Sequence, residues 1–558
     1  MSQGANLEGI LNQLLVKVVR EKFKVADEAF RQIKSHPLLE VPKEESFGDI
    51  STSIALKLAP VLKLSPRKIS QELASYLKQE ISAVPELRDR IEKVDIAGAG
   101  FVNFYFSKEY FYSFLKQIIK SENYSAPKPR KTKNVLVEFV SANPTGPLSV
   151  AHGRQAAVGD ALSNLLEFLG YEVTREYYLN DEGNQINILG NSVYLRLQEL
   201  RGEKIEFPED HYQGEYIVDL AKELFQSQVT GHRSQEYCKE YGVKRILEII
   251  KKELEDFGVR FDSWYSQLAL GKSGEIEEAI ALLKEKGFIY EREGAAWFES
   301  TKFGDDKDRV LIKSDGSYTY LAPDIAYHRD KFRRGFNWLI NLWGPDHHGY
   351  IARLKAAVEA LGQERSSLDV IIVQLATLLK AGEVVSMSTR KGEYITLRQV
   401  LDEVGLDAAR FFFLMRKTDS HLDFDLELAK KQNSENPVYY VQYAHARIAN
   451  ILSYANIPLS LLQKADTALL KEKEELDLLR ALAKFEYCLK IAEIQLDPYC
   501  LTVYLQELAE GLHRFYDARR VLIDDCQLRD ARLILILGCK KVISIGLKLL
   551  GVSAPEKM

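Results

Sequence analysis

Residues Asn134 to Leu169 read NVLVEFVSANPTGPLSVAHGRQAAVGDALSNLLEFL, and this stretch decides the fold class of the chain. Its first seven residues, up to Val140, are mostly β-branched or apolar, which is typical of a buried strand. From His152 onward, apolar residues recur at helical spacing. A loop that contains glycine and proline separates the two parts. The order of strand, loop and helix predicts the opening of a nucleotide-binding α/β fold.

The rest of the chain is organised around this unit. Further buried strands are predicted at Trp338–Trp343 and Val370–Gln374. They alternate with helices, which favours a parallel sheet with crossover helices. The basic, proline-containing stretch Ser125–Lys133 predicts a linker. We expect an α+β N-terminal domain at 1–124, an α/β domain at 125–435 with an insertion at about 190–313, and an all-helical domain at 436–558.

Composition narrows the class of protein. The 558 residues suggest about four domains at roughly 150 residues each. The 75 Lys and Arg against 80 Asp and Glu exclude a sheath of positive charge but allow a local basic face for nucleic acid. No apolar run approaches the roughly 18 to 20 residues of a membrane span, and no signal peptide is evident, so a cytoplasmic protein is expected. Five cysteines without a CxxC pair favour buried thiols over zinc or disulfide sites.

The first chemical signal is the loop SANPTGPLSVAHGR, Ser141 to Arg154, which joins the first strand to its helix. A helix N-terminus has free N–H groups and a partial positive charge, so it stabilises phosphates. Gly146 and Gly153 would let the backbone approach a ligand, and His152 would donate to phosphate oxygens. The alternative is a structural histidine beside a glycine-containing loop, since the P-loop pattern GxxxxGK[ST] is missing.

The second signal is GEVVSMSTRKGEYITL, Gly382 to Leu397. Two adjacent cations on a glycine-flanked loop, Arg390 and Lys391, can neutralise the charge that develops on a pyrophosphate leaving group. The alternative is an exposed basic hairpin without a ligand.

In this order and on this fold, the two segments resemble the HIGH and KMSKS signatures of class I aminoacyl-tRNA synthetases. Longer stretches resemble the bacterial-type arginyl-tRNA synthetases over nearly the whole chain. Those in the α/β and helical domains are YLNDEGNQI (178–186), DGSYTYLAPDIAYHRDKF (315–332), WGPDHHGY (343–350), LDFDLELAKKQNSENPVYYVQYAHARI (422–448) and GVSAPEKM (551–558). FGDISTSIALKLA (47–59) and SPRKIS (65–70) are similar to the family's N-terminal tRNA-contacting domain, and YDARRVL (516–522) to its DALR anticodon-binding motif, with Arg519 in place of Leu.

The resemblance implies a Rossmann-type class I catalytic domain, an α+β N-terminal domain and an all-α DALR-type domain. The implied activity is ATP-dependent ligation of L-arginine to tRNA(Arg) through an arginyl-adenylate, with AMP and pyrophosphate as products. Mg²⁺ is expected with ATP and without a dedicated protein site. A monomer is expected. The resemblance also implies that tRNA binds before the adenylate forms.

Carried over by position, the resemblance makes His152 the second histidine of HIGH and places Ser149 and Ala151 where the family usually has His and Gly. The KMSKS counterpart is SMSTR, Ser386 to Arg390, which lacks the usual lysines. We expect Arg390 and Lys391 to supply the charge. The implied catalytic residues are His152, Ser149, Arg390 and Lys391, and the implied ATP contacts are Gly146, Ser149, His152, Gly153, Met387 and Ser388.

The arginine pocket implied by the resemblance needs carboxylates at separated angles, because a guanidinium is a rigid fork of five donors. Glu138 and Asp324 are the natural pair. Glu138 stands in an apolar strand, where an unpaired carboxylate costs several kcal/mol, so we expect the cationic substrate to be its partner. The alternatives are a solvent-facing edge position for Glu138 and a helix cap for Asp324. The implied pocket residues are Glu138, Ser141, Asn143, Tyr320, Asp324 and Asp346, with His347 nearby.

Other interpretations stay open at this point. The histidine pair in DHHG lacks a third ligand within sequence reach, so no metal site is expected. A non-catalytic RNA-binding relative is one rival, motivated by Ser149 and Ala151. A class I synthetase for another amino acid is a second rival, although paired carboxylates disfavour a neutral side chain and lysine lacks the planar fork.

Overall fold

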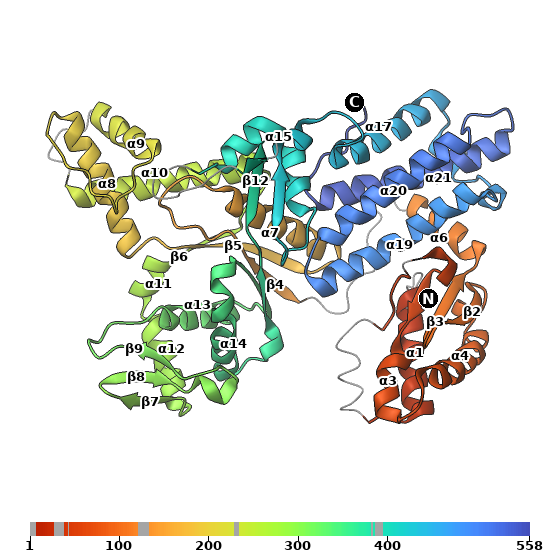
Figure 1. Ribbon diagram of the computed structural model, residues 1–558, viewed down its shortest axis with the longest axis horizontal. Coiled ribbons are helices and arrows are strands. Elements are labelled where there is room, and N and C mark those ends of the chain that lie inside the picture. Colours follow the sequence, from red (N-terminus) through yellow and green to blue (C-terminus); the bar gives the residue numbers. More distant parts are fainter. Residues whose placement is uncertain are drawn as a thin grey trace.

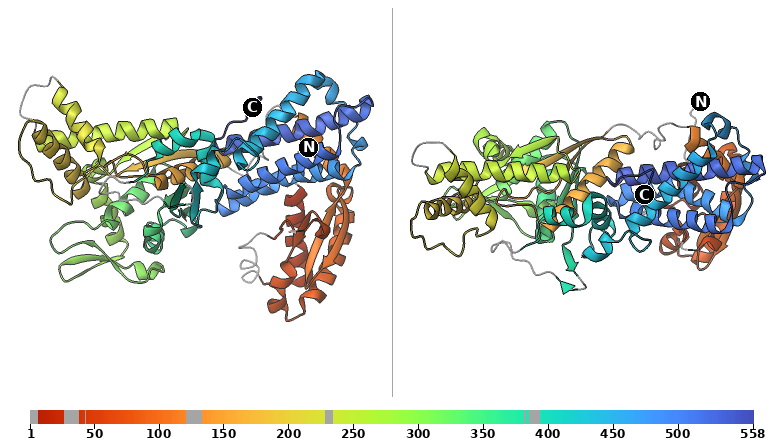
Figure 2. Two further views of the ribbon diagram at one scale, coloured as in Figure 1. Left: turned by 45° about the horizontal axis from the view of Figure 1, so that its top comes forward. Right: turned by 90° about the horizontal axis from the view of Figure 1, so that it is seen from above.

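The computed structural model describes residues 7–26, 38–42, 44–120, 133–227, 234–380, 383–384 and 394–558. Figure 1 shows an elongated molecule. The N-terminal unit, in red and orange, and the helical C-terminal unit, in blue, lie at one end, and the yellow and green elements lie at the other. The two further views in Figure 2 show the same elongated arrangement. Among the described residues, no helix combines the length and the apolar character needed to cross a membrane.

A five-stranded parallel sheet forms the centre of the molecule, as the sequence predicts. Its strands are rich in buried apolar residues because helices cover a parallel sheet on both faces. In spatial order the strands are β11 (Leu368–Ile372), β10 (Trp338–Trp343), β4 (Asn134–Glu138), β5 (Glu172–Leu179) and β6 (Ser263–Ser266). Helix α7 (Val150–Phe168) follows β4 and packs on β4, β5 and β10. The predicted strand, loop and helix are therefore confirmed.

The predicted insertion at about 190–313 needs a correction, because it contains β6. This strand pairs in parallel with β5 and is the edge strand of the central sheet. Helices α8 (Asn184–Leu200), α9 (Glu215–Gln226) and α10 (Gln235–Asp256) precede β6. A separate antiparallel sheet follows it, made of β7 (Ile289–Arg292), β8 (Ala295–Phe298) and β9 (Arg309–Ile312). The range therefore contains a first addition, the helices α8 to α10, before the core strand β6, and a second addition, which includes the β7–β9 sheet, after it.

The N-terminal unit is α+β, as predicted. Its antiparallel sheet has the order β1 (Ile50–Thr52), β3 (Phe101–Phe106), β2 (Ile91–Ala97). Helices α1 (Leu7–Phe23), α3 (Ile54–Leu62) and α4 (Pro66–Ala83) accompany it. Helix α6 (Lys108–Lys120) packs instead on the helical C-terminal unit, where the Tyr112 hydroxyl donates to the Leu470 carbonyl at 2.8 Å.

The C-terminal unit is helical, as predicted. Its main helices are α17 (Pro437–Ala455), α19 (Lys473–Gln495), α20 (Tyr499–Ala518) and α21 (Cys526–Leu549). The chain turns between α19 and α20 at Leu496, which has a positive φ of 51°, and Pro498 then precedes the next helix. This is the proline break that the sequence LDPYC predicts.

Candidate active site

The loop between β4 and α7 turns sharply as it leaves the sheet. Val140 and Ser141 both have positive φ, 68° and 40°. Helix α7 then begins after Ser149, whose backbone N–H donates to Nδ1 of His152 at 3.2 Å. Because Nδ1 accepts this bond, the proton of the neutral ring lies on Nε2. Burial lowers the pKa of His152 to about 4. His152 is therefore a neutral hydrogen-bond donor at the start of the helix.

Two helices of the first addition hold this loop in place. The Tyr216 hydroxyl, on α9, donates to the Thr145 carbonyl at 2.8 Å. The Glu253 carboxylate, on α10, accepts from the backbone N–H of Leu148 at 3.0 Å. Burial raises the pKa of Glu253. The loop is thus anchored from outside the sheet, by residues that no motif in the sequence marks.

The end of the second signature segment lies against the same loop. The backbone N–H of Leu397 donates to the Leu148 carbonyl at 2.7 Å, and the Tyr394 hydroxyl donates to the Pro147 carbonyl at 2.9 Å. The two signatures, 247 residues apart in sequence at the Tyr394–Pro147 contact, are therefore adjacent where the second one ends. The predicted ATP-binding and catalytic residues Met387, Ser388, Arg390 and Lys391 lie outside the described residues.

Gly146 and Gly153 make room for protein side chains. A Cβ at Gly146 would come within 3.0 Å of the Tyr216 ring and hydroxyl. A Cβ at Gly153 would come within 2.8 Å of the Leu397 side chain. The sequence predicts that the backbone approaches a ligand at both positions. The structure instead fills that room from α9 and α15 (Leu397–Leu414), so packing alone accounts for both glycines.

Glu138 has a partner within the chain, so the premise that a cationic substrate must neutralise it is wrong. Its carboxylate accepts a hydrogen bond from Nζ of Lys331, on α13 (Leu321–Arg333). Lys331 is fully buried and Glu138 is 7% exposed. The Lys331 ammonium also lies 3.3 Å from Oδ1 of Asn341 and 4.1 Å from the centre of the Tyr327 ring. The solvent-facing alternative for Glu138 is excluded as well.

Sequence reasoning missed Lys331, although a signal for it exists. Asp324, Tyr327, His328 and Lys331 follow helical i, i+3, i+4, i+7 spacing, so they share one face of α13. That face is turned toward β4 and β10. His328 makes hydrogen-bond contacts with the Asp324 carbonyl at 2.8 Å and with Nδ2 of Asn341 at 2.9 Å.

Asp324 lies in the first turn of α13 and belongs to the same polar cluster as Glu138. Its carboxylate accepts from the Tyr350 hydroxyl at 2.6 Å. Burial, with a smaller contribution from the negative charge of Glu138, raises the pKa of Asp324 to about 7, against the opposing effects of Tyr350 and Lys331. Asp324 is thus a carboxyl group that titrates near neutral pH and lacks a cationic hydrogen-bond partner among the described residues.

Ser141 and Asn143 connect the loop to the segment after β5. Oγ of Ser141 accepts from the backbone N–H of Tyr178 at 3.1 Å. The Asn143 side chain donates to Oε1 of Gln185 at 2.6 Å and accepts from the Asn180 amide at 3.0 Å. Both residues therefore stand at the edge where β4 and β5 end.

Tyr320 and Asp346 do not join the buried cluster. Tyr320 is 85% exposed. Asp346, in the short η3 helix (Pro345–Tyr350), is also exposed, and its carboxylate lies 3.3 Å from Nε2 of His347. The histidines of DHHG are likewise exposed. Across the described ranges, no three His, Cys, Asp or Glu side chains gather in a way that could hold a metal ion.

Comparison with known proteins decides the family. The model of the tRNA synthetases class I (R) catalytic domain matches residues 114–452. Arginine–tRNA ligase 1 of Halalkalibacterium halodurans is 45% identical over 567 residues, which span 100% of both chains. The chain belongs to the arginyl-tRNA synthetases. The arginine–tRNA ligase of Syntrophotalea carbinolica is 47% identical over 532 residues, which cover 93% of this chain and 94% of that protein.

The other two units of this synthetase chain also match family models. The arginyl-tRNA synthetase N-terminal domain matches residues 7–106, and the DALR anticodon-binding domain matches residues 441–558. The structure of Thermus thermophilus arginyl-tRNA synthetase has the same fold, with a TM-score of 0.77, 23% identity and coverage of 99% of this chain and 100% of that chain. The predicted fold class is confirmed. Arg519, which departs from the DALR spelling, pairs with Glu472 and Glu474 at the start of α19.

Proposed function

We propose that this chain ligates L-arginine to tRNA(Arg) where β4 and β5 end, through an arginyl-adenylate. The observation that carries the activity is identity of 45 to 47% to arginine–tRNA ligases over 93 to 100% of the chain. A carboxylate oxygen of arginine attacks the α-phosphorus of ATP and pyrophosphate leaves. The terminal ribose hydroxyl of tRNA then attacks the activated carbonyl, and AMP leaves. No side chain has to act as a nucleophile, so the chain's task is positioning and charge stabilisation.

We place the phosphates of ATP at the N-terminus of α7. The free N–H groups of the first turn and the helix dipole favour negative charge there. The Nε2 proton of His152 adds a neutral donor, because its Nδ1 is already occupied by the Ser149 N–H. Gly146 lies in the loop and Gly153 in the first turn of α7, and the contacts of Ser149, Gly146 and Gly153 with ATP stay predictions from the sequence. Mg²⁺ enters with the triphosphate of ATP.

We place the arginine substrate at the polar cluster of Asp324 and Glu138, beside α13. Asp324 is the carboxylate that meets the guanidinium, because the charge of Glu138 is already met by Lys331. The Glu138–Lys331 pair forms one wall beside it. Ser141, Asn143, Tyr320 and Asp346 stay assigned to this pocket as predictions from the sequence. Because Tyr320 and Asp346 are exposed, we propose that they contact the arginine from its solvent-facing side.

The roles of Arg390 and Lys391 against the leaving pyrophosphate, with Met387 and Ser388 against ATP, rest on the sequence. Their support is that Tyr394 and Leu397, which follow them, contact the loop before α7. We place the domains at 1–124, 125–435 and 436–558, and expect a monomer that works in the cytoplasm, where its tRNA substrate is used.

One experiment separates this function from its rivals. The purified chain is incubated with ATP, tRNA(Arg) transcript and each of the twenty amino acids in turn, and charged tRNA is measured. Charging with arginine alone is expected, and His152→Ala serves as the site control. Charging with another amino acid supports the second synthetase alternative. tRNA binding without charging supports the non-catalytic alternative.

A further inference from the structure

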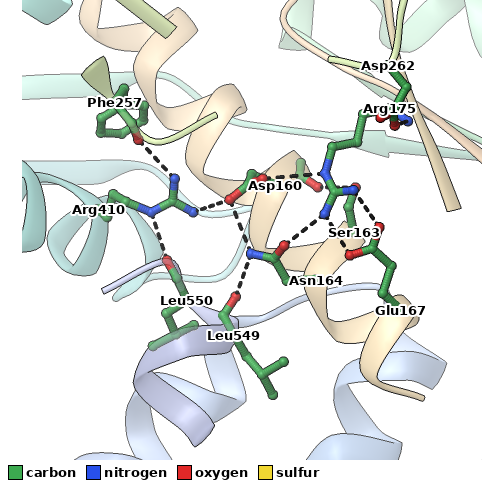
Figure 3. A network of polar contacts seen from close by, with 11 residues as sticks. Asp160, Ser163, Asn164, Glu167, Arg175, Phe257, Asp262, Arg410, Leu549 and Leu550 are labelled. Atoms are coloured by element: carbon green, nitrogen blue, oxygen red, sulfur yellow. Dashed lines mark hydrogen bonds and ion pairs between the residues drawn. The ribbon is translucent and has the colours of Figure 1, made fainter. Parts of the chain in front are cut away.

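A buried arginine joins three helices behind the candidate site. Arg410, on α15, has no exposed surface. Figure 3 shows its guanidinium at the centre of three contacts. Nε donates to the Leu550 carbonyl at 2.8 Å, Nη1 to the Phe257 carbonyl at 3.1 Å, and Nη2 to Oδ2 of Asp160 at 2.5 Å.

The two carbonyls are at helix ends. Leu550 is the C-cap of α21, in the helical unit, and Phe257 is the C-cap of α10. Carbonyls at a helix C-terminus lack partners within the helix and carry partial negative charge, so a buried cation is favourable there. Asp160 supplies the full negative charge from α7. One guanidinium therefore fixes the ends of α21 and α10 to the middle of α7.

Both α7 and α10 act directly on the loop at the candidate site. His152 lies on α7, eight residues before Asp160. Glu253 lies on α10, four residues before Phe257, and holds the Leu148 N–H. A displacement at Arg410 would therefore reach the loop through two rigid helices.

We call the contacts of Arg410 with Asp160, Phe257 and Leu550 the joint at Arg410. A second set of contacts, made by Asn164, supports it. Nδ2 of Asn164, one turn after Asp160 on α7, lies 3.2 Å from the Leu549 carbonyl and 3.2 Å from Oδ2 of Asp160. Its Oδ1 accepts from Nη2 of Arg175 at 2.8 Å (Figure 3). The backbone leaves α21 through Gly551, where a Cβ would come within 2.3 Å of the Arg410 guanidinium. Only glycine fits at position 551 beside the Arg410 side chain, so the backbone at the end of α21 packs directly against the guanidinium.

We propose that Arg410 is a positioning residue for adenylate formation, which sets α7 and α10, and with them the loop at 141–149, relative to the helical unit that matches the anticodon-binding family. It touches no reacting atom. This inference rests on the proposed function, because it assigns the loop to ATP.

The test compares three variants. Arg410→Lys keeps the charge but replaces a fork of five donors by a single ammonium, which cannot reach all three partners. Asn164→Ala removes the side-chain hydrogen bond from α7 to the Leu549 carbonyl at the end of α21, together with the Asn164 contacts to Asp160 and Arg175. Arg532→Lys is the matched control, because Arg532 is a buried arginine on α21 that binds Glu475 and the Arg520 carbonyl, all within the helical unit.

The measurement is the pre-steady-state burst of arginyl-tRNA formation with arginine, ATP and tRNA in saturating excess over enzyme, each variant being assayed well below its own unfolding temperature. At saturating substrate the burst rate constant does not depend on the fraction of active enzyme, and the burst amplitude reports that fraction. We expect Arg410→Lys to lower the rate constant at least tenfold and Asn164→Ala about threefold, with the arginine KM within threefold of wild type. Arg532→Lys should change only the amplitude or the unfolding temperature.

The outcomes separate the inference from the proposed function. If the wild-type chain does not charge tRNA(Arg), the proposed function fails. If the wild type charges but Arg410→Lys and Asn164→Ala change only the amplitude, as the control does, Arg410 is merely structural and the inference is overturned. Should Arg410→Lys not fold, Asn164→Ala decides: an unchanged rate constant overturns the inference, and a reduced one with a normal amplitude supports it.

Discussion

The ammonium group of Lys331 lies against the carboxylate of Glu138, and the two side chains are almost completely shielded from water. They come from different elements, 193 residues apart in the chain. Removing one partner of a buried pair leaves an uncompensated charge, whereas removing both often costs little. Comparing a single variant with the double variant therefore distinguishes the effect of losing this ion pair from an effect on substrate binding.

Glu138→Gln should lower the free energy of unfolding by about 3 to 5 kcal/mol, because it leaves the Lys331 ammonium buried and unpaired. It should also raise the KM for arginine more than threefold while the KM for ATP changes less, since the freed ammonium repels the guanidinium. Urea unfolding and steady-state charging measure the two effects.

The control for this prediction is Glu138→Gln combined with Lys331→Met. The double variant should be more stable than Glu138→Gln alone and should recover part of the arginine KM. A double variant as unstable as the sum of the two single ones would show that the two side chains are not coupled.

Arginine binding should improve as the pH rises through 7. Burial raises the pKa of Asp324 to about 7, so its carboxylate is mostly protonated at pH 6 and mostly ionised at pH 8. If the guanidinium binds the ionised form, the KM for arginine should fall about tenfold between these values. The folded-state pKa of Asp324 is raised above the ordinary value of 3.8, so the contribution of this group to stability is fully present below about pH 4, is lost as the pH rises to about 7, and changes little at higher pH.

Two variants locate this titration. Asp324→Asn should raise the KM for arginine and remove its dependence on pH. Tyr350→Phe removes the hydroxyl that stabilises the ionised carboxylate, so it should move the midpoint to higher pH. A KM profile that kept its midpoint in Asp324→Asn would assign the titration to another group.

His152→Ala should lower kcat about 10² to 10³ fold, which corresponds to roughly 2.7 to 4 kcal/mol of lost transition-state stabilisation. Because burial lowers the pKa of His152 to about 4, the ring is neutral over the working range and should produce no titration step in kcat above pH 5. Ser149→His should raise kcat at most about tenfold. Steady-state charging kinetics from pH 5 to 9 on the wild type and the two variants test this, and a fully active His152→Ala would place the phosphates elsewhere.

Arg154→Lys should destabilise the fold. The Arg154 guanidinium is fully buried and donates to the carbonyls of Gln374, Ser420 and Lys417 at 2.8 to 2.9 Å. A lysine cannot reach all of them, and each buried carbonyl left without a donor costs about 1 to 3 kcal/mol. Thermal unfolding should show a marked fall in Tm. An unchanged Tm would mean that water replaces the guanidinium.

The sequence predicts those parts of the fold whose signals are local. The apolar run before Val140 and the helical spacing after His152 identify β4 and α7, although β4 ends at Glu138 because Val140 and Ser141 adopt positive φ. The proline of LDPYC places the turn between α19 and α20 within a few residues. In these cases the covalent neighbours carry the information.

Features that depend on contacts between residues far apart in the chain cannot be predicted from local sequence patterns. Strand β6 has the sequence SWYS, too short and too polar to stand out from a loop, and only pairing with β5 makes it a strand. Gly153 resembles a ligand-binding glycine, but its neighbour is Leu397, far along the chain. Lys331 faces Glu138 only because α13 lies against β4 in three dimensions.

The joint at Arg410 also sets the order in which the enzyme becomes competent during synthesis. Phe257 and Asp160 precede Arg410 in the chain, but Leu550 follows it by 140 residues. At roughly 5 to 20 residues per second, a ribosome needs roughly 7 to 28 s to cover that distance. During this interval Nε of Arg410 cannot donate to the Leu550 carbonyl, because Leu550 has not yet been synthesised. The catalytic unit can therefore acquire its final geometry only once α21 and Leu550 have emerged, so the catalytic and helical units should mature together rather than one after the other.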